Sequence, residues 1–194
     1  MTRPFLPVLL LLLAATLTSC GGSLFKVKPA AELPPLPENS RSAEAGDLTV
    51  RVAPSLTDEE SQELFEANLP LAGILPLRLE LVLHSGGPVE IRKVRFRLRD
   101  GQNREWKLLS SKKAISQIMK TNGIRLYNPN SRRRFEQEFG EYGIDSKTPL
   151  TPGDPRQGFL FFQSPDKKAV TAGQQFELTV ERLPQTASIA VPVF

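Results

Sequence analysis

The sequence has very little of the chemistry that most enzymes and metal sites use. Of its 194 residues, one is a cysteine, Cys20, and one is a histidine, His84. A single cysteine cannot form a disulfide within the chain, and one histidine gives little basis for nucleophilic catalysis or for a zinc site. No glycine-rich loop precedes a helix to hold phosphate. The sequence therefore predicts no catalytic residues, no metal and no cofactor.

Long apolar runs are also scarce, since the only one lies at the N-terminus. Arg3 precedes an uncharged stretch, Pro4–Leu17, that is followed by small residues, which is typical of a secretory signal peptide. A membrane-spanning helix needs about 20 apolar residues, and this run is shorter. We therefore expect residues 1–19 to be removed on export.

The end of this segment, Leu17-Thr18-Ser19-Cys20, resembles the signal of bacterial lipoproteins. The resemblance implies diacylglycerol on the Cys20 sulfur, cleavage before Cys20 and acylation of the new amino terminus. Two or three acyl chains hold a protein firmly on a membrane, whereas one chain binds only marginally. Gly21 stands where inner-membrane retention signals usually have Asp. The resemblance thus implies a lipid-anchored protein of the cell envelope, in the outer membrane and facing the periplasm.

The mature chain divides into two parts. Residues 20–46 are rich in proline and small polar residues, which predicts a lipidated, extended tether. Residues 47–194 have a length typical of one domain. The chain carries 25 Lys and Arg against 21 Asp and Glu, so it is only mildly basic. This balance gives no reason to expect a nucleic-acid partner.

The domain contains several segments typical of β-strands. Apolar residues alternate with polar ones in many of them, as in a half-buried strand. The turn Ser85-Gly86-Gly87-Pro88 predicts a hairpin between its two flanking strands, with a β-bulge near Arg92 and Lys93. The seven expected strands are 47–52, 75–84, 89–98, 105–109, 157–163, 175–181 and 188–194.

Seven strands favour a mainly β fold, an immunoglobulin-like antiparallel β-sandwich with short inserted helices. A small open barrel is the alternative. The run Leu150-Thr151-Pro152-Gly153, followed by Gly158–Phe162 and Pro165, resembles immunoglobulin-like domains of bacterial lipoproteins. That resemblance covers a short part of the chain and implies the fold alone.

Three helices are expected between the strands. Thr57 and Glu60 fit a capping box at the start of a short helix. Apolar spacing predicts a second helix over Lys112–Lys120, and a third runs from Pro129 to about Tyr142. The last two belong to an insertion at about 110–151, and insertions of this kind often carry function.

Two groups of basic side chains are candidates for contact with an anionic partner. The first alternates along one strand and projects from one face of the sheet; it consists of Lys93, Arg95, Arg97 and Arg99. The second lies near the start of the third helix and consists of Arg132, Arg133 and Arg134. Lipid headgroups, lipopolysaccharide, a cell-wall glycan or an acidic protein would suit either group. The simpler interpretation is a solvated surface in which Arg132 pairs with Glu136 and Arg134 with Glu138.

These observations predict a membrane-anchored, non-enzymatic binding or assembly module. Its expected partners are the bilayer, through the acyl chains, and an envelope protein or anionic glycan. One alternative is a polysaccharide hydrolase that uses acidic residues, which requires two carboxylates in one cleft. Another is a carrier of a hydrophobic ligand, with Leu69–Leu83 lining an internal apolar cavity.

Overall fold

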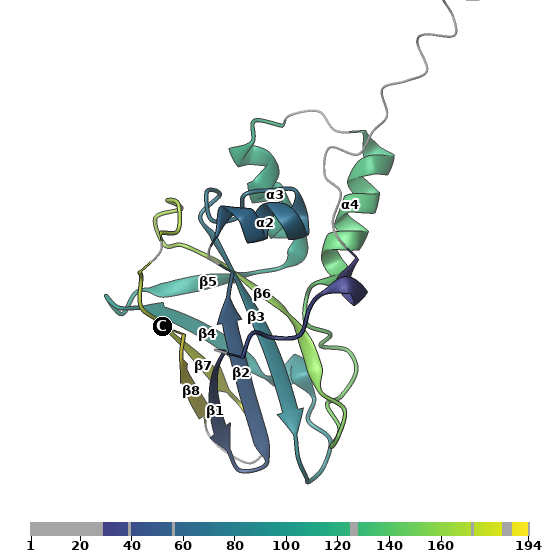
Figure 1. Ribbon diagram of the computed structural model, residues 1–194, viewed down its shortest axis with the longest axis vertical. Helices are drawn as coiled ribbons and strands as arrows, with labels where there is room; N and C mark the ends of the chain where they lie inside the picture. The colour runs from purple at the N-terminus through teal and green to yellow at the C-terminus, as the bar shows by residue number, and fades with distance from the viewer. Residues whose placement is uncertain are drawn as a thin grey trace, which may run out of the picture.

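The computed structural model describes residues 29–38, 40–55, 57–124, 128–171, 173–183 and 188–193. The expected signal peptide and Cys20 lie outside the described residues. Within that part, eight antiparallel strands form one nearly closed sheet, and three α-helices gather at one end of it (Figure 1). The strands are β1 Arg41–Ala45, β2 Leu48–Pro54, β3 Ile74–Leu83, β4 Arg95–Asp100, β5 Glu105–Leu109, β6 Arg156–Gln163, β7 Phe176–Glu181 and β8 Ser188–Pro192. The helices are α2 Asp58–Phe65, α3 Ser111–Thr121 and α4 Pro129–Glu141, with short 3-10 turns η2 Ala30–Glu32 and η3 Ile91–Lys93.

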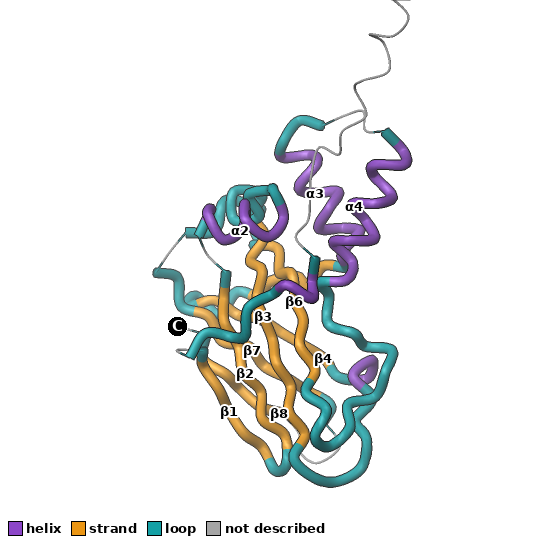
Figure 2. Tube along the Cα trace, turned by 45° about the vertical axis from the view of Figure 1, so that its right-hand side comes forward, coloured by secondary structure: helices purple, strands orange, loops and turns teal. Residues whose placement is uncertain are grey.

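The mainly β class is confirmed, but an immunoglobulin-like sandwich is not. A sandwich needs two separate sheets, whereas here the strand order is β1-β2-β3-β6-β5-β4-β7-β8. β5 joins the two halves, because Glu105 and Trp106 pair with β4 while Lys107–Leu109 pair with β6. The edge strands β1 and β8 approach each other (Figure 2). The sheet is therefore barrel-like and closer to the open-barrel alternative.

The prediction of a hairpin across Gly86 and Gly87 is wrong. β3 pairs with β2 and β6, and β4 pairs with β5 and β7. Val89 makes only an isolated bridge with Leu150, and η3 replaces the expected bulge. A tight turn reverses the chain, but it does not force the two flanking strands to pair when a distant strand offers a better apolar face.

The segment expected to be a tether belongs to the folded domain from Pro29 on. Its last residues form β1, which pairs with β2 along its whole length. Leu36 is buried, with 6% of its surface exposed. In the β1 sequence, Arg-Ser-Ala-Glu-Ala, Ala43 and Ala45 alternate with exposed polar residues and are partly buried. Alanine is depleted in strands, so this short edge strand gives only a weak signal in the sequence. The domain therefore begins well before residue 47.

Period-two alternation divides the apolar side chains between two cores. On β6, Leu160 and Phe162 face the inside of the sheet, and Phe159 and Phe161 face outward. The inner core fills the barrel with buried side chains from β2 to β8, including the only tryptophan, Trp106, and Ala43 and Ala45 of β1 pack against it. Eight-stranded barrels have an interior just wide enough for side chains. The interior is therefore occupied by the protein itself.

The second core lies between the outer face of the sheet and the three helices. Its centre is aromatic, with ring centroids 4.9 Å apart for Phe65 and Tyr142 and 4.8 Å apart for Phe139 and Phe161. Pairs of this kind add about 0.5–1.5 kcal/mol each to the effect of burial alone. The helices α3 and α4 thus complete a core, and the insertion at 110–151 has a structural role.

The three expected helices are confirmed. The Thr57 hydroxyl oxygen accepts a hydrogen bond from the Glu60 amide at 3.1 Å, which caps α2. Asn128 caps α4 by accepting from the amides of Asn130 and Ser131, and Pro129 occupies the first helical position, where its missing N–H costs nothing.

Candidate functional site: a cavity beneath the N-terminal strap

The segment Leu33–Glu38, which we call the N-terminal strap, crosses the outer face of the sheet between η2 and β1 (Figure 1). Three of its residues are proline, Pro34, Pro35 and Pro37. Proline has no N–H group and cannot add a regular rung to a sheet. The strap is instead held by side chains of the strands beneath it.

Arg78 of β3 provides the main attachment of the strap. Its guanidinium donates to the carbonyl oxygen of Pro34 and, at 3.4 Å, to that of Pro35. Only 8% of Arg78 is exposed. Burial lowers the pKa of Arg78, while the nearby Glu80 carboxylate acts in the opposite direction. An arginine side chain stays charged in proteins, so the strap is held by charge-assisted hydrogen bonds.

Glu80 organises the remainder of this polar layer. Its carboxylate accepts from Arg51 Nη1 at 2.7 Å and from Gln157 Nε2 at 2.5 Å. Arg51 also donates to the hydroxyl of Ser40 at 3.0 Å. The buried Glu80 carboxylate is therefore paired with Arg51, and the buried Arg78 guanidinium is satisfied by oxygen acceptors, as the cost of burying a charge requires. The network connects β2, β3 and β6 with the segment that precedes β1.

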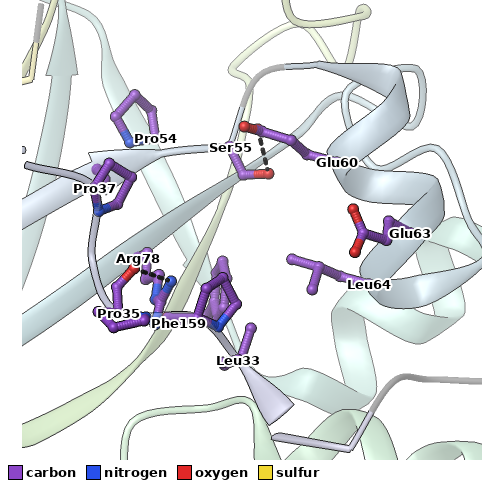
Figure 3. Close-up of a pocket in the computed structure, with 12 residues that line it drawn as sticks. Leu33, Pro35, Pro37, Pro54, Ser55, Glu60, Glu63, Leu64, Arg78 and Phe159 are labelled. Carbon is purple, nitrogen blue, oxygen red and sulfur yellow. Dashed lines mark hydrogen bonds between the residues drawn. The ribbon is translucent and has the colours of Figure 1, made fainter. Parts of the chain in front are cut away.

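A cavity of about 230 Å³ lies between the strap, the end of β2 and α2 (Figure 3). Most of its wall is apolar. The lining residues are Leu33, Pro34, Pro35, Pro37, Ala53, Pro54, Ser55, Glu60, Glu63, Leu64, Arg78 and Phe159. Small-molecule sites are usually larger, about 300–1,000 Å³. The cavity is of a size to receive a single large apolar side chain.

Polar groups stand at one side of this cavity. Ser55 donates from its hydroxyl to a Glu60 carboxylate oxygen at 3.0 Å, while Glu63 and Leu64 project from α2 (Figure 3). Both carboxylates come from the same helix. A hydrolase of the two-carboxylate kind places them on opposite sides of the bond to be cleaved. The carboxylates that line this cavity therefore lie on its α2 side.

The basic residues expected on one strand separate into two settings. Arg97 lies 3.3 Å from Glu181 and 4.0 Å from Glu105 through its ion pairs, and Arg99 donates to Asn103. Lys93 belongs to η3 and not to the strand, and it pairs with Glu90 at 3.0 Å. Arg95 is exposed and has no ion pair with any residue that the structure describes. Ion pairs therefore offset the charges of Lys93 and Arg97, whereas Arg95 and Arg99 have no ion pair with a described residue and keep their positive charge.

The second basic group follows the simpler interpretation. Arg132 pairs with Glu136 at 2.9 Å and Arg134 with Glu138 at 2.6 Å, both one turn along α4. Only Arg133 has no such partner within the described part of the chain. These salt bridges offset the positive charges of Arg132 and Arg134, to which an anionic partner would bind.

The remaining candidates do not converge on a reactive centre. His84 is exposed, and its Nε2 lies 2.8 Å from the hydroxyl of Thr49. Asp145 pairs with Arg156 at 2.8 Å. No group of three or more potential metal ligands occurs among residues 29–193 where they are described.

Sequence reasoning missed the strap and its cavity. The available signal was the charged pair Arg78 and Glu80 on the second face of a leucine-rich strand, together with a proline-rich segment near the start of the domain. Comparison with protein-family models, curated proteins and solved structures finds no match for this chain. None of the helices within the described ranges has the length and apolar character that a membrane span requires.

Proposed function

We propose that this protein is a lipid-anchored, non-enzymatic binding module of the bacterial cell envelope, held at Cys20 in the outer membrane and facing the periplasm. Its cavity receives an apolar side chain of another envelope protein. The observation that carries this proposal is that the strap, which begins 13 residues after Cys20, itself forms one wall of the cavity.

The position of the strap favours a partner close to the membrane. An extended chain spans at most about 3.6 Å per residue, so the cavity lies within about 45 Å of the acylated cysteine. A pocket that takes one anchoring side chain is a common centre of protein interfaces. The proposal therefore combines an anchor, a short connection and a docking site.

The two alternative functions have less support. A carrier of a hydrophobic ligand needs an internal apolar space, and the leucines expected to line it, among them Leu75, Leu77 and Leu79, pack in the inner core. A polysaccharide hydrolase needs two carboxylates on either side of a glycosidic bond, and the two glutamates that line the cavity, Glu60 and Glu63, both come from α2.

Site-specific photo-cross-linking in membranes tests the docking site. A photoreactive amino acid at Leu33, in the cavity wall, should yield one defined adduct. The same group at Leu71, which is 59% exposed and does not line the cavity, should not. Replacing Ala53 with Phe fills the cavity and should abolish the adduct. An adduct that persists with Ala53→Phe would contradict the proposed site.

The anchor is tested separately. Labelled fatty acid should be incorporated into the protein, and Cys20→Ser should prevent both labelling and recovery with the membrane fraction. If the Cys20→Ser protein remained with the membranes and carried no label, the anchor proposal would be wrong while the cavity could still be a docking site.

A further inference from the structure

Four cations surround a shallow hollow at the N-terminal end of β4. Besides Val94, its lining consists only of Arg92, Lys93, Arg95 and Arg182, and its volume is about 690 Å³. We call these four residues the basic corner. Two adjacent segments supply them, because Arg95 pairs with Glu181 across β4 and β7, which places Arg182 beside the start of β4.

The basic corner carries more positive charge than its neighbours compensate. Glu90 is the acidic partner within it, at 3.0 Å from both Arg92 Nη2 and Lys93 Nζ. Hydrogen bonds from Lys93 and Arg92 lower the pKa of Glu90, so it stays ionised and offsets one of the four charges. Glu181, although opposite Arg95 in register, makes its ion pair with Arg97.

The fold itself does not require charged side chains in the basic corner. Arg92 and Lys93 each expose 69% of their side chains. Arg182 has a φ of 65°, in the left-handed region that disfavours residues other than glycine and asparagine. A long cation is thus placed at a position where a small residue would suit the backbone better.

We propose that the basic corner binds the phosphate groups of anionic membrane lipids. The hollow is open and its cations are long and exposed, which suits a surface that presents many phosphates more than a single enclosed ligand. The short connection from the anchor to the strap keeps the domain close to the membrane surface. This part of the reasoning rests on the proposed anchor at Cys20.

Vesicle binding tests the proposal on the full mature chain with Cys20→Ser, which removes the acyl chains. The protein should bind vesicles of mixed phosphatidylcholine and phosphatidylglycerol, should not bind pure phosphatidylcholine, and should dissociate as salt is raised. Each basic residue near an anionic surface contributes roughly fivefold in affinity. Arg95→Gln combined with Arg182→Asn should therefore weaken binding about 30-fold.

The matched control removes the same net charge elsewhere. Arg132→Gln combined with Arg134→Gln takes two cations from α4, where they already pair with glutamates, and should change binding by less than about twofold. The only tryptophan, Trp106, lies in the inner core, so its fluorescence verifies that each variant is folded.

Three results would overturn the proposal. The first is the absence of binding to the anionic vesicles, and the second is an equal loss in the control, which would indicate net charge alone. The third is displacement by inorganic phosphate but not by chloride at the same ionic strength, which would indicate a site for a free anion. Labelling of Cys20 and cross-linking at the cavity do not depend on these arginines, so the two proposals can fail separately.

Discussion

Replacing Arg78 with methionine should release the N-terminal strap while the barrel stays folded. To the strap, the guanidinium makes one short hydrogen bond, to the Pro34 carbonyl, and one of 3.4 Å, to that of Pro35. A hydrogen bond with a charged donor contributes about 1.5–3 kcal/mol, and the longer bond adds little. Methionine keeps the apolar part of the side chain. The expected loss in strap attachment is therefore about 2 kcal/mol.

A loss of this size corresponds to a roughly 30-fold larger population of the open strap. Proteolysis by a glutamate-specific protease measures that population. Glu38 is exposed at the end of the strap, but a protease must bind the residues before the cleaved bond, and Leu36 is buried while the strap is attached. Cleavage after Glu38 should become about 30-fold faster in the variant. The urea midpoint of the barrel, followed by Trp106 fluorescence, should change little because Trp106 is in the inner core.

The control is Arg133→Met, which removes an exposed cation of α4 and should leave cleavage after Glu38 unchanged. The reasoning is refuted if Arg78→Met cleaves at the rate of the unmodified protein. It is also refuted if faster cleavage is accompanied by an equal loss of the Trp106 signal, since the strap would then detach only when the whole domain unfolds.

Three further predictions concern stability. Gly158→Ala should lower the free energy of unfolding by about 3 kcal/mol in urea titrations, because a Cβ there would lie 2.5 Å from Ile144 Cα. Gly140→Ala, in an open helical position, should raise the free energy of unfolding by about 0.5–1 kcal/mol. If both variants changed stability in the same direction, the close approach of Gly158 to Ile144 would be contradicted. Burial raises the pKa of Tyr142 to about 12. The stability that the neutral phenol contributes should therefore be complete below about pH 10 and fall as the pH rises toward 12. Thermal unfolding at each pH measures this, and the pH dependence should be absent from Tyr142→Phe. Burial would raise the pKa of Asp100, but hydrogen bonds from the Trp106 side chain and from Arg104 and Gln102 prevail and lower it. The stability that Asp100 provides should therefore be present above about pH 4 and be lost as the pH falls below that value. An Asp100→Asn variant with the same acid dependence would refute this.

Local structure could be predicted well from the sequence because it depends on local patterns. Alternating apolar residues located β2 and β3, and the capping residues Thr57 and Asn128 located the starts of α2 and α4. The salt bridges from Arg132 and Arg134 followed from helical spacing. These features depend on residues no more than a few positions apart.

Strand pairing could not be predicted in the same way. β3 and β6 pair although Leu77 and Leu160 are far apart in sequence, and neither strand carries a mark of its partner. β5 pairs with β4 through one half and with β6 through the other. This pairing makes one sheet, whereas the seven expected strands had suggested a sandwich of two sheets. Register and closure depend on how whole faces fit together.

The candidate site escaped prediction for a related reason. Arg78 and Glu80 alternate with leucines, so their expected environment was water. A segment more than 40 residues earlier covers Arg78 instead and uses it as a hydrogen-bond donor. Whether a polar residue on a strand faces water or a covering segment therefore depended on a part of the chain that the local sequence pattern does not reveal.

The way in which the strap is fastened has a mechanical consequence. A force that enters the domain at Pro29 meets a few side-chain bonds from Arg78 and Arg51 before it meets a ladder of backbone bonds. Those attachments are the weaker link, so tension would peel the strap away first and lengthen the connection by several residues. The strap would thus absorb part of the tension before any force acts on the backbone hydrogen bonds of the barrel.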